Sequence, residues 1–205
     1  MDKQKKLYTI KLVKQKLNSK WCGAACAKMV FDYYDKPIFS LEETWGKVSE
    51  RLSNNIENCR TYKIENLFIG NGFFSMVIRF TDLRGILNYC QDNQIPAIMN
   101  VHSIMGAKLS HFIVFKGYDT SGNAIKILDP EDETRHVVQF PELEDSFKKY
   151  FDGDDVGGNT IILVKQDMQN IKEIVCPICG CTHIIDPQIE PFIDAVLCPN
   201  NDRWF

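Results

Sequence analysis

The chain has 205 residues, of which 44% are hydrophobic and 25% are charged, and its formal net charge at pH 7 is -3. This balance is typical of a globular protein with a sizeable core, and it excludes an overall positive field that would hold nucleic acid or an anionic membrane. No apolar run approaches the roughly 18 residues of a membrane span, and the N-terminus lacks the apolar segment of a secretory signal. We therefore expect a cytoplasmic protein with no membrane span and no nucleic-acid partner.

The eight cysteines divide the chain. In a reducing compartment a cysteine cluster indicates metal binding or catalysis rather than disulfides. Because the polar segment 165–173 separates the two groups of cysteines, we predict a main domain at residues 1–165 and a linker with a cysteine-rich tail at residues 166–205. The first group is Cys22, Cys26, Cys59 and Cys90; the second is Cys176, Cys179, Cys181 and Cys198.

The first part of the main domain is predicted to be mostly helical. Residues 7–13 alternate weakly and suggest a short strand. Residues 22–34 place their apolar side chains near one face of a helix. Ser40 followed by Glu43 is the signature of a capping box for a second helix over residues 40–52, and a third helix is expected over residues 81–93, with Thr81 as its cap.

The later part of the main domain reads as strands. Its apolar runs are short, rich in β-branched and aromatic residues, and separated by turn chemistry such as "DTSGN" and "DP". One more helix is expected over residues 141–151, with Pro141 in its first turn. Helices followed by a mostly antiparallel sheet make an α+β domain. The expected strands are 96–102, 111–119, 124–128, 136–140 and 160–164.

Cys22 is the candidate nucleophile. It stands where the first helix should begin, and a helix N-terminus favours the thiolate through its unpaired N–H groups and its dipole. The alternative is a small buried apolar side chain, since free cysteines are among the most buried residues. Cys26 follows one turn later and is predicted to face the core.

Three residues elsewhere complete a candidate catalytic site. His111 opens the most hydrophobic strand and is the expected base, although His102 is a rival and a buried structural histidine is a further alternative. Asp129 ends the next strand, so a hairpin would bring it beside His111 and let it orient the imidazole. Gln15, seven residues before Cys22, would supply a side-chain amide to an oxyanion.

These residues carry a resemblance to a known family. Gln15, "CGAACAKMVFDYY", "IPAIMNVH" and "HFIVFKGYDTSGNAIKILDP" resemble the papain-like cysteine peptidases that trim double-glycine leader peptides from bacteriocins, together with their stand-alone bacterial relatives. The resemblance covers roughly Lys11 to Asp129 and extends more loosely to Lys165. It implies a papain-like fold with Cys22 as nucleophile, His111 as base, Asp129 as its orienting partner and Gln15 in the oxyanion hole. Trp21 stands where the leader peptidases usually have an aspartate.

The tail carries a candidate zinc site. "CPICG" has two cysteines separated by two residues, followed by a glycine that permits a tight turn. Zinc takes four ligands, and Cys198 is the expected third. For the fourth, His183 is favoured over Cys181, because Cys181 is almost adjacent to Cys179 in the chain. The predicted ligands are therefore Cys176, Cys179, His183 and Cys198, and the alternative is a tail without metal or with an oxidised pair.

Together these patterns predict a cysteine peptidase that hydrolyses a peptide or protein substrate and carries a structural zinc in its tail. The same four residues would serve an acyltransferase or a deamidase, and an inactive adaptor would keep the fold and only bind peptides. A zinc-organised interaction protein with no catalytic cleft is the remaining alternative. A protein partner that binds through the zinc tail is also expected.

Overall fold

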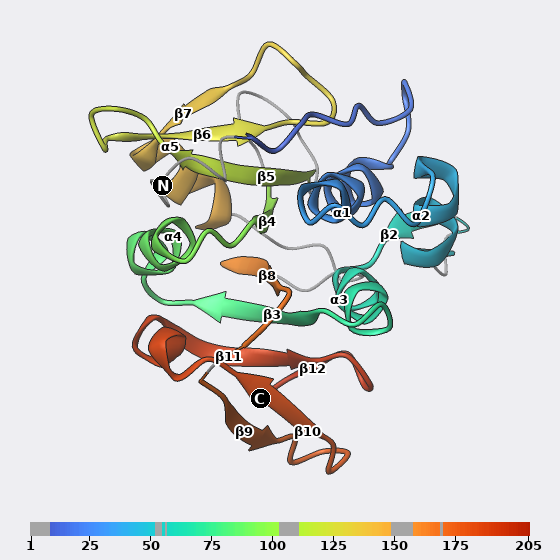
Figure 1. The fold of residues 1–205 in the computed structure, drawn as a ribbon, viewed down its shortest axis with the longest axis vertical. Coiled ribbons are helices and arrows are strands. Elements are labelled where there is room, and N and C mark those ends of the chain that lie inside the picture. Colours follow the sequence, from blue (N-terminus) through green and yellow to red (C-terminus); the bar gives the residue numbers. More distant parts are fainter. Residues whose placement is uncertain (1–8, 52–54, 56, 103–110, 149–157, 169) are drawn as a thin grey trace.

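The computed structural model describes residues 9–51, 55, 57–102, 111–148, 158–168 and 170–205 (Figure 1). Within these residues, eight strands form one sheet in the order β12-β11-β3-β8-β4-β5-β6-β7, and every neighbouring pair is antiparallel. The strands of this sheet are β3 (Phe74–Phe80), β4 (Ala97–Val101), β5 (His111–Tyr118), β6 (Ala124–Leu128), β7 (Val137–Gln139), β8 (Thr160–Lys165), β11 (Ile193–Cys198) and β12 (Arg203–Trp204). The expected α+β architecture with an antiparallel sheet is thereby confirmed.

Two short hairpins and the helices surround this sheet. In the view of Figure 1, α1, α2 and α3 gather on the right of the sheet, whereas α4 and α5 lie on the left. Helix α1 packs against β5 and helix α3 against β3. The hairpin strands are β1 (Ser49–Arg51), β2 (Glu57–Cys59), β9 (Lys172–Val175) and β10 (Thr182–Ile185); the helices are α1 (Cys22–Tyr33), α2 (Leu41–Val48), α3 (Thr61–Ile69), α4 (Leu83–Asp92), α5 (Phe140–Lys148) and the 3-10 helix η3 (Pro187–Phe192).

Helix α1 is the central helix of the core. Small residues in its first two turns, including Ala24, Ala25 and Cys26, are fully buried, so the helix approaches its neighbours closely. Gly23 is required by this packing, since a Cβ built there would lie 2.3 Å from the Cys59 sulfur. The expected helix over residues 22–34 is confirmed, and Cys22 is its first residue.

Two of the expected helix caps have different outcomes. The capping box of α2 forms as expected, with Ser40 and Glu43 exchanging backbone-to-side-chain hydrogen bonds. The cap of α4 is Asp82, whose carboxylate accepts a hydrogen bond from Gly85 N, so the prediction that Thr81 caps this helix is wrong. A carboxylate one residue closer to the helix is the better-placed acceptor for its free N–H groups.

The strand predictions are confirmed in the second half and incomplete in the first. All five strands expected after residue 95 are present as β4, β5, β6, β7 and β8. No strand forms over residues 9–13, and the start of the expected strand at residues 7–8 lies outside the described residues, as does the end of the helix expected to reach residue 151. Helix α3 and strand β3 were not predicted from the sequence.

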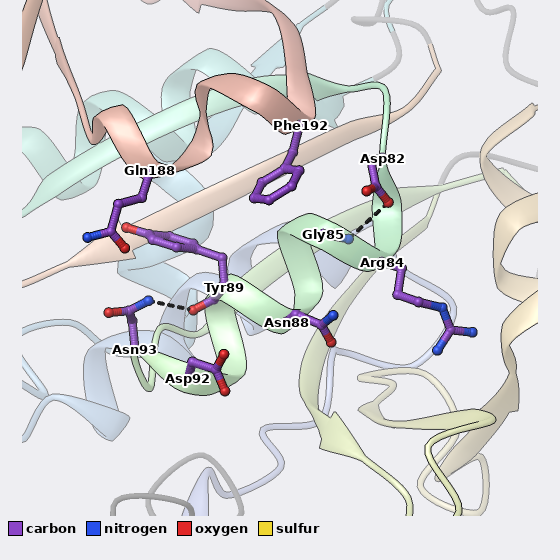
Figure 2. A pocket seen from close by; sticks show the side chains of 9 residues that line it. All are labelled: Asp82, Arg84, Gly85, Asn88, Tyr89, Asp92, Asn93, Gln188 and Phe192. Atoms are coloured by element: carbon purple, nitrogen blue, oxygen red, sulfur yellow. Dashed lines mark hydrogen bonds between the residues drawn. The ribbon is translucent and has the colours of Figure 1, made fainter.

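The tail continues the main sheet instead of forming a separate layer. Strand β11 pairs with β3, and β12 pairs with β11 at the edge. Helix η3 lies against α4, where the Phe192 ring lies over Gly85 (Figure 2) and leaves no room for a Cβ there, because an added Cβ would be 2.5 Å from the ring. The main sheet contains strands from both sides of residue 165. Whether residues 1–165 and 166–205 fold independently stays a prediction.

No helix in the described parts of the chain has the length and apolar character that a membrane crossing requires.

Candidate active site

Cys22 occupies the first turn of α1. The preceding residue, Trp21, is the N-cap and makes no side-chain cap hydrogen bond, so the first N–H groups of the helix are left without that partner. The Trp21 ring stacks on Trp45 of α2 with centroids 5.4 Å apart and planes 14° apart, which fixes the entry of the chain into the helix. Only 8% of Cys22 is exposed.

His111 connects Cys22 to Asp129. His111 is the first residue of β5 and lies beside the start of α1, because β5 packs on α1. His111 Nε2 lies 2.7 Å from Asp129 Oδ1, and the Cys22 side chain is close enough to the imidazole to affect its pKa. Because Asp129 uses Nε2, the ring nitrogen left for Cys22 is Nδ1. Burial lowers the pKa of His111, but the hydrogen bond with Asp129 and the interaction with Cys22 outweigh burial and raise it to about 10.

Asp129 is a fully buried carboxylate with partners on both oxygens. Its Oδ1 accepts the Glu131 N–H at 2.9 Å in addition to the contact with His111, and its Oδ2 accepts Arg135 Nη1 at 2.8 Å. Burial raises the pKa of Asp129, yet the His111 contact, the backbone hydrogen bond and the Arg135 charge together hold it below its usual value. Sequence reasoning did not find Arg135; the one available signal was a lone arginine shortly after the "DP" turn.

Gln15 lies next to this turn. Its backbone N–H donates to the Pro130 carbonyl at 2.9 Å, which ties the segment before α1 to the residue after Asp129. Its side-chain Nε2 donates to the Ser19 carbonyl at 3.0 Å, so one amide hydrogen is used and the second is left. The other amide atom, Oε1, is buried and has no hydrogen-bond partner among the described residues.

The arrangement brings together a thiol, an imidazole and a carboxylate, and the imidazole is hydrogen-bonded to the carboxylate. The imidazole can accept the thiol proton, and the carboxylate stabilises the imidazolium and keeps the ring oriented. His102 contributes to the fold through its backbone, whose N–H donates to the Ser146 carbonyl.

The tail cysteines converge on one point. The sulfur atoms of Cys176, Cys179, Cys181 and Cys198 all lie within 4.8 Å of one another, which is a group that could hold a metal ion. His183, the expected fourth ligand, is not in this group; its Nε2 lies 2.9 Å from Cys181 Sγ. The cluster lies at the lower end of the molecule in Figure 1, with β9, β10 and β11, whereas α1, β5 and β6 are in the upper half.

Two hollows lie elsewhere on the described surface. An open groove of about 740 Å³ runs between α4 and η3, and polar side chains such as Asn88, Asp92 and Gln188 line it (Figure 2). A smaller pocket of about 230 Å³ lies between α3, β3 and β10, with Glu65 in its wall. Neither is lined by any of the four residues expected to be catalytic.

Comparisons with known proteins identify the family and the fold of the chain. Residues 7–153 match the family described as Peptidase_C39 like. No curated protein matches the chain significantly. Among solved structures, the peptidase domain of Streptococcus ComA, a bifunctional ABC transporter of a quorum-sensing pathway, is similar with a TM-score of 0.56 and 20% identity, over 77% of this chain and 99% of that one.

A second solved structure, a double glycine motif protease from an AMS/PCAT transporter in complex with the leader peptide, has a TM-score of 0.51 and 19% identity, over 76% of this chain and 92% of that one. At such identities the two structures show a shared fold. The family match covers well over half of the chain and confirms the resemblance seen in the sequence. The chain therefore belongs to the Peptidase_C39 like family and is a papain-like cysteine peptidase.

Proposed function

We propose that this peptidase cleaves a peptide or protein substrate with Cys22 as nucleophile, His111 as general base and acid, and Asp129 as the residue that orients His111. Gln15 and the backbone N–H of Cys22 stabilise the oxyanion. The observation that carries the proposal is the 2.7 Å contact between His111 Nε2 and Oδ1 of the buried Asp129, together with the effect of the Cys22 side chain on the pKa of the same imidazole.

The reaction has two halves. The Cys22 thiol gives its proton to His111 and its sulfur attacks the substrate carbonyl, forming a tetrahedral oxyanion. This intermediate collapses to a thioester while the imidazolium protonates the departing amine. Water, deprotonated by His111, then attacks the thioester, and the thiol leaves with the proton as the carboxylic acid product is released.

The protonation of His111 supports this mechanism. Because its pKa is raised to about 10, the imidazole that has accepted the Cys22 proton holds it across the neutral range and keeps a positive charge beside the Cys22 sulfur. This proton is then available to the leaving amine at neutral pH.

Gln15 can act on the oxyanion in either of two ways. Its Nε2 donates to Ser19 O, while its Oε1 is buried without a partner among the described residues. A buried amide oxygen without a donor is costly. A rotation of the side chain, or the second hydrogen of Nε2, would serve the oxyanion of a bound substrate.

A peptide is the substrate class that the relatives support. One structural neighbour was solved as a double glycine motif protease in complex with the leader peptide. Peptides with a double-glycine cleavage site are therefore the first probes, together with a mixture of unrelated peptides.

The eight free cysteines, all in the described part of the chain, support the expected reducing, cytoplasmic setting.

The test begins with the thiol. Limiting iodoacetamide should label Cys22 selectively well below pH ~8.5, where an ordinary thiol ionises, and His111→Ala should abolish this selectivity. Cys22→Ala identifies the labelled site, and intact mass gives the stoichiometry. Uniform labelling that follows an ordinary thiol in the wild type would overturn the proposed pair.

Product masses then separate peptidase from the alternatives. Hydrolysis yields two fragments whose masses sum to the substrate plus one water, transfer to an added amine yields an amide, and deamidation changes a glutamine without cutting the chain. An active Cys22 with no cleavage of any peptide, and with an amide or deamidated product instead, would replace peptidase by transferase or deamidase.

The partner expected at the tail is part of this proposal. Exposed apolar side chains at Ile171, Val175 and Ile178 on and beside the β9–β10 hairpin support it, since each is more than half exposed.

A further inference from the structure

We propose that Cys176, Cys179, Cys181 and Cys198 bind one Zn²⁺ through four thiolates, and that this ion fastens the β9–β10 hairpin to the end of β11. The site is separate from the peptidase chemistry and does not depend on it.

The sulfur positions fit a tetrahedral ion. Cys179 and Cys181 sulfurs are 3.0 Å apart, and the Cys198 sulfur lies 3.6 Å and 3.4 Å from them. A tetrahedron with Zn–S bonds of about 2.3 Å has sulfur atoms about 3.8 Å apart. A disulfide would need about 2.05 Å, and all four cysteines are free. Four thiols this close need a cation to relieve their mutual repulsion once they are deprotonated.

The turn that carries three of these cysteines is built for an ion. Gly180 has φ +74°, a conformation that glycine adopts without strain. Its N–H donates to the Cys176 carbonyl, while the Cys176 N–H donates to the Cys181 carbonyl, each at 2.9 Å. The Asn201 amide also reaches the Cys176 sulfur at 3.4 Å. Donors to a ligating sulfur are the outer contacts that hold metal ligands in place.

The fourth ligand is Cys181 in this geometry, not His183. The tight turn at Gly180 brings Cys181 back beside Cys179, so their closeness in the chain does not prevent them from sharing one ion. His183 Nε2 lies 2.9 Å from Cys181 Sγ, and its ring packs 5.2 Å from Phe205. This places the imidazole as a hydrogen-bonding neighbour of a ligand.

The ion would join two parts of the fold. Among the described residues, β9 and β10 pair only with each other and with no strand of the main sheet. Cys198, by contrast, ends β11, which pairs with β3. A single ion would therefore tie the hairpin to the main sheet.

The turn after Cys198 extends this link to α3. Asn66 Nδ2 donates to the Pro199 carbonyl at 3.2 Å, and Arg60 pairs with Asp202 at 3.0 Å. Because this turn starts directly after the ligand Cys198, its order should depend on the ion as well.

The first test uses the wild-type chain, purified under reducing, anaerobic conditions. We expect one zinc per chain by elemental analysis after gel filtration. Cys179 is exposed and Cys181 half-buried, so both should react at once with N-ethylmaleimide if they were free. With the ion in place they should be protected, and a strong chelator should expose all four cysteines to labelling, as mapped by peptide mass. Co²⁺ should give the intense absorption of a tetrahedral thiolate site.

Variants decide the ligand set. Cys181→Ser and Cys198→Ser should lose most of the zinc, whereas His183→Ala should keep it, and Cys22→Ala serves as a thiol-removing control outside the cluster that also keeps it. Loss of zinc from His183→Ala together with its retention in Cys181→Ser would overturn the four-thiolate site.

The wild-type result also stands without the variants. If a variant fails to fold, judged by its circular dichroism, the labelling and Co²⁺ spectrum of the wild type still decide. Immediate labelling of Cys179 and Cys181 with no zinc and no Co²⁺ uptake would rule the site out.

Finally, chelation should increase hydrogen exchange in β9, β10 and residues 199–202 at least several-fold, and unchanged exchange there would overturn the fastening role. None of these readouts involves peptidase activity.

Discussion

At the residue scale, Asp129 is the side chain on which the proposed catalytic chain depends. It receives His111 and a backbone N–H on one oxygen and Arg135 on the other. A carboxylate with both oxygens engaged cannot rotate away from the imidazole without giving up its 2.8 Å contact with the half-buried Arg135. Arg135 is thus a positioning residue, since it acts through Asp129 and contacts neither the nucleophile nor the base in any hydrogen bond of the described residues.

Arg135→Gln should weaken the reactivity of Cys22. With Oδ2 released, Asp129 would hold His111 less firmly, and small displacements in a catalytic site cost about 10- to 100-fold in rate. We expect the alkylation rate of Cys22 at neutral pH, and kcat with any cleaved peptide, to fall in this range with little change in KM. Arg135→Lys should recover part of it. The control is Arg79→Gln, which removes an arginine paired with Asp194 at the surface. Equal effects of the two glutamine variants would contradict the positioning role.

Glu65 is a second buried carboxyl, in the wall of the pocket beside β10. Only 1% of the residue is exposed, its Oε1 accepts the Val77 N–H at 3.2 Å, and its Oε2 has no hydrogen-bond partner among the described residues. Burial raises the pKa of Glu65 well above its usual value, so the folded protein keeps this proton to a higher pH than the unfolded chain does.

Glu65→Gln should remove a pH-dependent loss of stability. Above about pH 4.3 the unfolded chain releases the Glu65 proton that the folded chain keeps. The unfolded state then binds fewer protons, so stability falls as pH rises, by up to about 1.4 kcal/mol per pH unit until the folded pKa is reached. Urea unfolding of wild type and variant should show a stability difference that grows in favour of the variant between mildly acidic and neutral pH. The exposed Glu173→Gln should show a flat difference, and a flat difference for Glu65→Gln would contradict the buried neutral carboxyl.

The candidate site was predictable from sequence where a residue stands at the boundary of an element. Cys22 precedes an apolar helical pattern, and His111 and Asp129 open and close two strands of one hairpin, so the pattern itself brings them together. Arg135 and Cys181 were not predictable in this way. The position of Arg135 depends on the course of a turn, and that of Cys181 on a left-handed glycine, neither of which has a periodic signal.

At the scale of elements, the same distinction holds. The late strands were predictable because turn residues separate short β-branched runs. Helix α3 was missed because its N-cap, Arg60, makes no side-chain cap hydrogen bond, and β3 was missed because a short continuous apolar run does not distinguish a buried strand from a helix. Pairing with strands distant in the sequence makes this run a strand. β3 lies between β8 and β11 in the sheet, and its Val77 and Ile78 are fully buried.

The packing of α1 on β2 provides a test of this close fit. In Gly23→Ala the new Cβ would lie 2.3 Å from the Cys59 sulfur and 3.1 Å from Ile64, so we expect the variant to be less stable by about 1–3 kcal/mol in spite of the better helix propensity of alanine. Gly46→Ala is the matched control, because α2 leaves the space there open, and it should be more stable by about 0.5–1 kcal/mol.

A double variant isolates the contact. Adding Cys59→Ala to Gly23→Ala removes the sulfur and should recover most of the lost stability in urea unfolding. If the double variant instead loses as much stability as the single variants Gly23→Ala and Cys59→Ala together, the contact between α1 and β2 is not the cause of the instability of Gly23→Ala.

At the scale of the whole molecule, the tail completes the sheet of the peptidase domain. Strand β11 covers β3, pairing Val196 with Ile78 and Ile193 with Phe80. The tail also adds apolar side chains to the core, including Ile189 and Leu197, which are fully buried. Lys165 and Tyr89 hold the buried Asp186 just before η3, with contacts of 2.9 Å and 2.6 Å. The distribution of the cysteines and the polar segment 165–173 suggested two modules. Hydrogen bonds and buried side chains connect the residues before and after that segment.

Removal of residues 166–205 tests whether these modules fold independently. The truncated chain would expose the edge of β3, with its apolar side chains and unpaired N–H and C=O groups, which is a template for pairing with another chain. We therefore expect it to unfold at a lower temperature than the full chain and to associate with rising concentration, as measured by sedimentation velocity. The full chain at the same concentrations is the control. A truncated chain that stays monomeric and keeps its unfolding temperature would instead support two independent domains. In that case the β3–β11 pairing would stabilise the tail and not the peptidase sheet.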